Sequence, residues 1–146
     1  MRRFLVRTAW RFHRWIYRVT GGRLGGRIVG MPVLLLTTTG RRSGRSHHVG
    51  LTYVPHGSGY AVIGSNGGAS NHPDWLLNLR ASPRAAVQIR DRTSLVQARE
   101  AAGAERHRLW EMAAAAYSGY DAYRKRSGRK IPVVILEPLS GLYERS

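Results

Sequence analysis

Cysteine is absent from this 146-residue chain, and acidic residues are scarce. Without cysteine there can be no disulfide, iron–sulfur cluster, thiolate zinc site or cysteine nucleophile. The eight Asp and Glu residues leave little room for paired catalytic carboxylates, and so few acids also argue against a metal site. The sequence therefore speaks against an enzyme whose own side chains carry out redox, acid–base or metal chemistry unaided.

Long hydrophobic runs are missing as well. The longest, residues 31–36, falls far short of the roughly 20 residues that a membrane-spanning helix needs. The basic N-terminus also lacks the apolar stretch of a secretory signal. Together with the absence of cysteine, these features predict a cytoplasmic protein.

Positive charge is abundant, with 24 Lys and Arg against 8 acids and a net charge of +16. Such a balance fits a nucleic acid, an anionic membrane or an acidic small ligand as partner. Within residues 1–20, apolar residues and arginines each recur at spacings of three and four, which predicts an amphipathic helix. An Arg-rich face beside Trp and Tyr is typical of a helix that lies on an anionic membrane, here the inner face of the cell membrane. Docking on the rest of the protein is the alternative.

A basic amphipathic helix with a Gly-rich connector (1–29) is expected to precede one folded domain (30–146). Apolar and β-branched segments predict strands at 32–39, 47–55, 60–65, 85–90, 94–100 and 131–137. Helix-forming segments predict helices at 74–81, 104–117 and 120–126. Because short turns join most strands, we expect a mainly β (α+β) fold in which an antiparallel sheet closes into a small barrel with peripheral helices.

The segment TTTGRRSGR (37–45) is the first candidate binding site. Two glycines flank Arg41, Arg42 and Ser43 at a turn between strands, and glycine lets successive backbone N–H groups converge on an anion. The guanidinium groups and the hydroxyl add charge-assisted donors. The turn therefore suits a phosphate or carboxylate, with a solvated hairpin turn as the alternative.

Two further segments are candidates. In SNGGASNHPDW (65–75), a Gly-rich loop permits close approach of a ligand, and the helix N-terminus that follows favours negative charge. In YSGYDAY (117–123), three tyrosines are spaced three apart. Ordinary packing is the alternative for both segments. An anion-binding turn, a glycine loop and an aromatic wall, without conventional catalysts, indicate an enzyme that relies on a cofactor.

Four segments, LLLTTTGRRSGR, VIGSNGG, HPDWLLNLRASP and GYDAYRKRSGRKIPVVILEP, lie in this order within residues 30–138. They resemble the deazaflavin (F420)-dependent nitroreductase and quinone reductase family, split β-barrel oxidoreductases related in fold to flavin-binding enzymes. The resemblance implies hydride transfer from reduced coenzyme F420 to a quinone, nitro or activated-alkene acceptor. An FMN-binding reductase of the same fold and a basic nucleic-acid-binding barrel are the alternatives.

The resemblance also implies roles for individual residues. Arg41, Arg42 and Ser43 would hold the phosphate and carboxylates of the cofactor's lactyl-glutamate tail. Tyr120 would donate a proton or orient the acceptor. The complete implied cofactor site is Arg41, Arg42, Ser43, His47, His48, Val49, Ser65, Asn66, Gly67, Pro73, Asp74, Trp75 and Leu76. The implied substrate pocket is Tyr117, Tyr120 and Tyr123.

The chain departs from some members of that family at two of these positions, His47 and Asn66, and also at Thr52. His47 stands where some relatives have a permanently charged residue, and Asn66 where some have lysine. A neutral histidine holds an anion less strongly, so we expect weaker or pH-dependent binding of the tail. Thr52 replaces an aromatic residue of some members, which changes the expected acceptor side.

Overall fold

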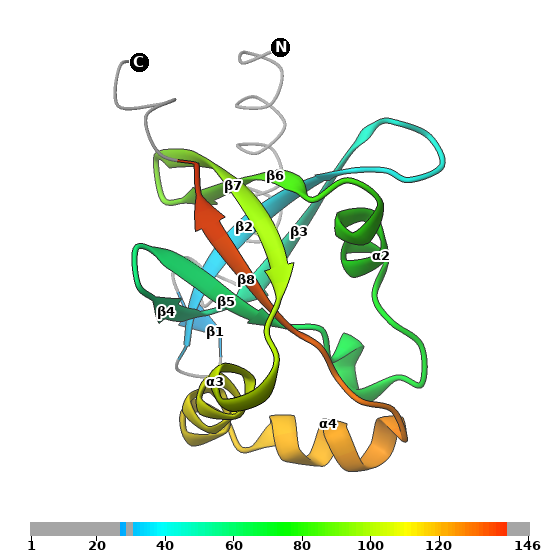
Figure 1. Cartoon of the computed structure of the whole chain (residues 1–146), viewed down its shortest axis with the longest axis vertical. Coiled ribbons are helices and arrows are strands. Elements are labelled where there is room, and N and C mark those ends of the chain that lie inside the picture. The colour runs from blue at the N-terminus through cyan, green and yellow to red at the C-terminus, as the bar shows by residue number, and fades with distance from the viewer. Residues whose placement is uncertain (1–26, 29–30, 140–146) are drawn as a thin grey trace.

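The computed structural model of the chain describes residues 27–28 and 31–139 (Figure 1). The amphipathic helix expected at 1–20 lies outside these residues, so its existence and the proposed division at residue 30 stay predictions. Among the helices in the described part, none is long and apolar enough to cross a membrane.

The described strands form one antiparallel sheet, as the sequence predicts. They are β1 (Arg27–Ile28), β2 (Met31–Thr39), β3 (Ser46–Thr52), β4 (Val54–His56), β5 (Gly59–Ile63), β6 (Arg84–Ile89), β7 (Arg92–Glu100) and β8 (Val133–Pro138). Their order is β1-β2-β6-β7-β8-β5-β4, and β3 also pairs with β2. The strand expected at 47–55 is divided at Tyr53, where the chain passes from β3 to β4.

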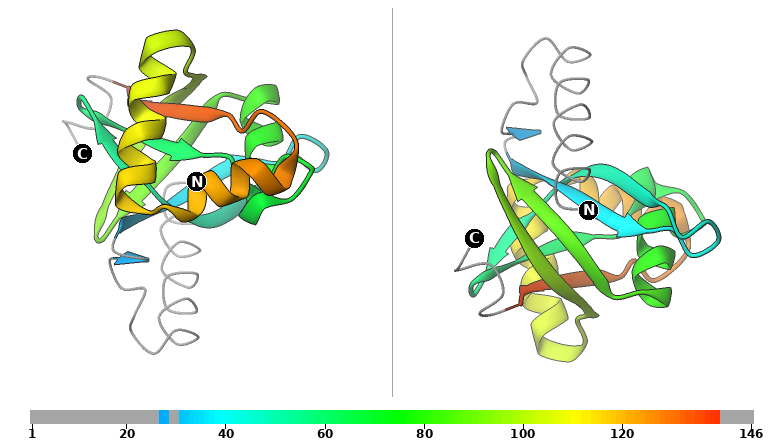
Figure 2. Two further views of the ribbon diagram at one scale, coloured as in Figure 1. Left: turned by 90° about the horizontal axis from the view of Figure 1, so that it is seen from below. Right: turned by 90° about the horizontal axis from the view of Figure 1, so that it is seen from above.

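This division curls the sheet. β3 pairs with β2 and β4 pairs with β5, so the chain crosses from one edge of the sheet to the other through a single residue, Tyr53. The strands therefore wrap around a common interior, as both views in Figure 2 show. The result is the expected curled, barrel-like antiparallel sheet with helices outside.

The helices are α2 (Asp74–Ala81), α3 (Gly103–Ala116) and α4 (Gly119–Ser127), and a short 3₁₀ turn, η1, covers Asn66–Gly68. In Figure 1, α3 and α4 lie together below the sheet, whereas α2 lies at its side, next to β2. Pro73 precedes α2 in extended conformation, as proline favours at the beginning of a helix.

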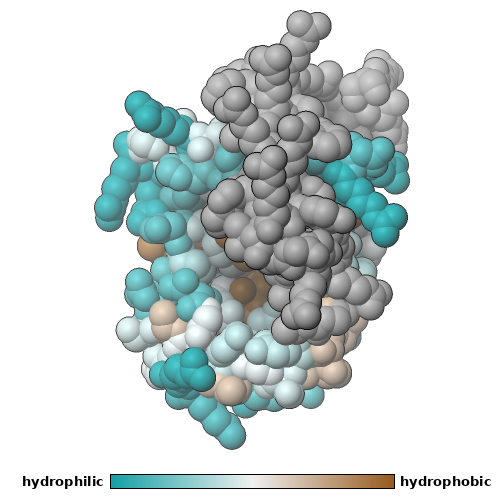
Figure 3. Space-filling model, turned by 180° about the vertical axis from the view of Figure 1, so that it is seen from behind, coloured by the Kyte–Doolittle hydropathy of each residue, from teal (hydrophilic) through white to brown (hydrophobic). Residues whose placement is uncertain are grey.

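Strand β8 connects the two parts of the apolar core. Side chains alternate between the faces of a strand, and both faces of β8 are buried. Val133 and Ile135 pack with residues of α3 and α4, whereas Val134 and Leu136 pack with α2 and the barrel interior. The described surface seen from behind is mostly hydrophilic, with few scattered hydrophobic residues (Figure 3).

Candidate functional site

A cavity of about 520 Å³ lies between the β2–β3 turn and the beginning of α2. Its volume is in the range of sites for small organic ligands and cofactors. It is lined by Thr38, Gly40, Arg41, Arg42, Ser43, His47, His48, Val49, Asn66, Pro73, Asp74, Trp75 and Asn78.

Ten of the thirteen residues of the implied cofactor site border this cavity. The other three lie elsewhere: Leu76 is buried in the core, Ser65 is buried just before η1, and Gly67 is exposed in η1. The tertiary structure adds Thr38, Gly40 and Asn78. For Asn78 a sequence signal existed, because a polar amide stands four residues after Asp74 among the leucines of α2.

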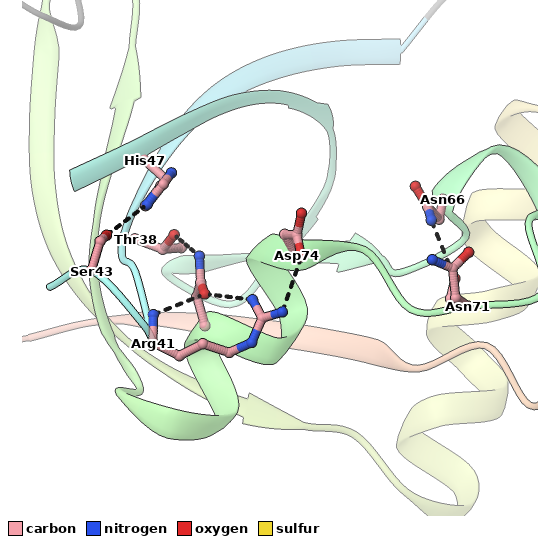
Figure 4. Close-up of polar contacts among 8 residues, drawn as sticks. Thr38, Arg41, Ser43, His47, Asn66, Asn71 and Asp74 are labelled. Carbon is pink, nitrogen blue, oxygen red and sulfur yellow. Dashed lines mark hydrogen bonds and ion pairs between the residues drawn. The ribbon is translucent and has the colours of Figure 1, made fainter. Parts of the chain in front are cut away.

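Arg41 is held on α2 by three hydrogen bonds (Figure 4). Asn78 Oδ1 accepts from the Arg41 backbone N–H at 3.1 Å and from Nη1 at 2.9 Å. Nη2 donates to Asp74 Oδ1 at 3.1 Å. Asn78 is buried, and its own amide donates to Thr38 Oγ1 at 3.2 Å, so the orientation of its amide is determined. The guanidinium of Arg41 is therefore fixed at one end of the cavity before any ligand binds.

The β2–β3 turn is tightly packed. A Cβ at Gly40 would stand only 2.5 Å from His47 Nε2 and 2.7 Å from Ser43 Oγ, so only glycine fits here without movement. The backbone N–H of Gly40 donates to the Arg45 carbonyl, and that of Gly44 donates to the Gly40 carbonyl. The Arg45 N–H donates to Ser43 Oγ. The N–H groups of both glycines and of Arg45 therefore stabilise the turn itself, so they are not free for an anion in this arrangement. The side chains of Arg42 and Ser43 are exposed beside them and remain available as donors.

The two adjacent histidines of β3 both border the cavity, although alternation along a strand directs them to opposite faces. His47 Nε2 lies 3.3 Å from Ser43 Oγ, across the turn. His48 Nδ1 lies 2.8 Å from Thr37 Oγ1, on the neighbouring strand. Partial burial, and then the neighbouring His47, lower the pKa of His48 below its usual 6.5. His48 is consequently neutral near pH 7, whereas the cationic groups of the cavity are Arg41 and Arg42.

Arg129 holds the loop that carries Asn66 to the cavity; it lies in the last of the four motif segments, but the sequence indicated no role for it. Its guanidinium donates to His72 Nδ1 at 2.7 Å. It also donates to the carbonyl oxygens of Gly64 at 2.9 Å, Ser65 at 3.1 Å and Ala69 at 3.1 Å. Because arginine stays protonated, His72 Nδ1 must be the acceptor, so His72 is neutral in this arrangement. One side chain thereby satisfies three backbone carbonyls on the two sides of η1.

The three tyrosines gather in one cluster, but outside the cavity lining. Tyr120 is only 6% exposed, and its hydroxyl lies 2.6 Å from Thr52 Oγ1 at the end of β3. The Tyr117 and Tyr123 hydroxyls are 3.1 Å apart, and both rings contact that of Tyr120. Burial raises the pKa of Tyr120 above its usual 10. The phenol is therefore fully protonated at neutral pH, as a proton donor must be.

Known proteins resemble this chain in sequence and in structure. The sequence model of the F420H(2)-dependent quinone reductase family matches residues 9–138. A Mycobacterium tuberculosis protein named F420H(2)-dependent quinone reductase is 36% identical over 130 residues, which are 86% of this chain and 87% of that protein. The solved structure of an F420-H2 dependent reductase, FDR-A, is 40% identical with a TM-score of 0.67, over 73% of this chain and 94% of that one. A Listeria structure described as a pyridoxamine 5'-phosphate oxidase (16% identical, TM-score 0.52, over 73% of this chain and 82% of its own) shares the fold alone.

The contact between Arg129 and His72 makes stability depend on pH. Burial, followed by Arg129, lowers the pKa of His72 below 6.5 in the folded protein. The unfolded chain therefore binds a proton first as the pH falls. We expect the stabilising contribution to be complete above about pH 6.5 and to decrease from there down through the lowered folded pKa.

Urea unfolding midpoints between about pH 8 and about pH 5 test this expectation. His72→Asn places an acceptor that does not titrate near the position of Nδ1, so its midpoint should fall less steeply over that interval. Equal slopes for the variant and the original chain would show that His72 does not contribute.

Proposed function

The chain belongs to the F420H(2)-dependent quinone reductase family, and on this premise we propose that it binds reduced F420 in the cavity beside α2 and reduces a quinone. The observation that carries the proposal is the composition of the cavity, which has cationic side chains at the β2–β3 turn and an aromatic residue, Trp75, in its wall. A flat ring joined to an acidic tail needs these two environments side by side. Nitro compounds and activated alkenes are further acceptor classes for the same chemistry.

The acidic tail is proposed to lie against Arg41, Arg42 and Ser43. Arg41 is already oriented by Asn78, so little side-chain entropy is lost when an anion binds there. Arg42 and Ser43 are exposed beside it and supply further donors for a phosphate or carboxylate. The ring is proposed to lie further along the cavity, between the strand residues His48 and Val49 and the α2 side.

Quinone reduction needs a hydride and a proton, and the bound cofactor supplies the hydride. The protein's contributions are then orientation, exclusion of water and the proton. We propose that Tyr120 delivers the proton or orients the acceptor, with Tyr117 and Tyr123 shaping the acceptor side. Supporting this role, the Tyr120 hydroxyl is bonded to Thr52 of β3, the strand whose other end borders the cavity. Tyr123 also packs against Gly68, in the loop that carries Asn66.

The first prediction concerns the tail. Arg41→Ala with Arg42→Ala should raise the dissociation constant for F420 at least about tenfold, because two charge-assisted contacts together exceed about 1.4 kcal/mol. Titration of the cofactor's fluorescence measures the constant. Arg92→Ala with Arg108→Ala removes the same charge from two exposed sites outside the cavity lining and should have little effect.

A folded double variant at Arg41 and Arg42 that binds F420 unchanged would mean that the turn has no role in binding. Titration of the original chain with FMN completes the test. Tight binding of FMN without binding of F420 would mean that the cofactor is a flavin and not a deazaflavin.

The second prediction concerns Tyr120. Tyr120→Phe should lower kcat by about tenfold or more, as expected for loss of a general acid, and leave the dissociation constant for F420 within about twofold. Thr52→Val is the matched control, because it removes the same hydrogen bond but keeps the phenol. If the two variants have equal kcat values, the phenol has only a packing role.

We further propose, from sequence pattern alone, that residues 1–20 bind an anionic membrane surface, where lipophilic quinones are available. Each Lys or Arg near such a surface contributes about 1 kcal/mol. Full-length protein should therefore sediment with anionic vesicles more than with zwitterionic ones, and a chain beginning at Gly22 should lose this preference. Equal sedimentation of both chains would exclude the membrane role and leave the reductase assignment intact.

A further inference from the structure

Asp74 places a negative charge at the cationic end of the cavity. It is the first residue of α2, and its carboxylate lies 3.1 Å from Arg41 Nη2 (Figure 4). The Asp74 side chain is 87% exposed, whereas that of Arg41 is 23% exposed. Asp74 also borders the cavity, together with Arg41 and Arg42. The arginine proposed to receive the acidic tail thus already has an anionic partner within the protein.

Arg41 keeps two of its three hydrogen bonds without this partner. The buried Asn78 accepts hydrogen bonds from both the backbone and the side chain of Arg41, and is itself bonded to Thr38. Asp74 therefore adds one further hydrogen bond and a negative charge at this position. An exposed ion pair of this kind contributes only about 0–1 kcal/mol, so an incoming anion can replace the carboxylate at small cost.

We propose that Asp74 is a competitor built into the site, which lowers the affinity for the cofactor's tail by occupying and neutralising Arg41. This inference rests on the proposed function, because the anion in question is the tail of F420. Each acceptor reduced consumes one reduced cofactor, and the oxidised cofactor has to leave before the next can bind. A carboxylate that returns to Arg41 as the tail departs speeds this exchange.

The alternative role of Asp74 is to stabilise the beginning of α2, where an acidic residue interacts favourably with the helix dipole. The two roles have different consequences. Loss of a helix-stabilising charge lowers the unfolding midpoint and leaves the affinity for F420 unchanged. Loss of a competitor strengthens binding of the tail and leaves binding of the ring unchanged.

The test is Asp74→Asn, which keeps an acceptor oxygen for Arg41 and removes the charge. Its dissociation constant for F420 should fall about three- to tenfold at low salt, the effect of one unit charge a few ångströms away in a solvent-exposed setting. The dissociation rate constant should fall in parallel, and salt should reduce both effects. Binding of the tail-less deazaflavin chromophore should stay within about twofold.

Two variants serve as controls. Asp91→Asn makes the same charge change in the exposed turn between β6 and β7 and should leave the F420 constant within about twofold. Asp74→Ser retains a residue suited to a helix beginning, so it repeats the measurement if the asparagine variant proves unstable. Both should be compared with the original chain by fluorescence titration and stopped-flow dilution.

The outcomes separate the inference from the proposed function. If the original chain and all variants fail to bind F420, the proposed function is wrong. If F420 binds but its constant is unchanged or higher in the folded Asp74 variants, the competitor role is overturned and the reductase assignment remains. The competitor role is also overturned if the Asp74 variants bind the tail-less chromophore more tightly by the same factor, because Asp74 would then act on the ring and not on the tail.

Discussion

The two-sided burial of β8 is the constraint on which the rest of the structure depends. One face of this strand completes the barrel interior, and the other supports α3 and α4. β8 also lies between β7 and β5 in the sheet, so it joins the two parts of the curled sheet through hydrogen bonds as well as apolar contacts. A polar residue at any of the first four positions of β8, Val133–Leu136, would place a polar group in one of the two apolar clusters.

The candidate site depends on β8 through the segment that directly precedes this strand and carries Arg129. Arg129 lies four residues before β8, and the fixed position of the strand brings its guanidinium to the loop of Gly64, Ser65 and Ala69. At the opposite wall, Asn78 serves a similar purpose for the β2–β3 turn. Both residues are polar, at least partly buried and fully engaged in hydrogen bonds. An irregular turn and loop thereby acquire definite positions without regular secondary structure.

The chemistry of the site follows from the side chains that line the cavity. The described residues bring cations, hydroxyls and an aromatic wall to one cavity, and among them no cluster of three or more His, Asp and Glu side chains could hold a metal ion. Such a site can bind and orient a cofactor, which is the protein's part in an F420-dependent oxidoreductase. Arg41 contacts both Asn78 and Asp74, and in the proposed site the first contact orients its guanidinium while the second opposes its charge.

Much of this protein follows from its sequence alone. Hydrophobic period, glycine turns and prolines are local signals, so they predicted most β strands, the three described helices and the antiparallel sheet to within a few residues. They missed the break at Tyr53 and the two-residue strand β1, which lies in the segment expected to be a Gly-rich connector. Four ordered motifs identified the family, and ten of the residues they implied meet at one cavity. Only the tertiary structure showed that the glycine-turn amides are used internally, and that Asn78, Asp74 and Arg129 hold or balance the site. The reason is physical: the contacts of Asn78, Asp74 and Arg129 join residues 33 to 65 positions apart, and sequence pattern has no period at which a distant hydrogen bond can be recognised.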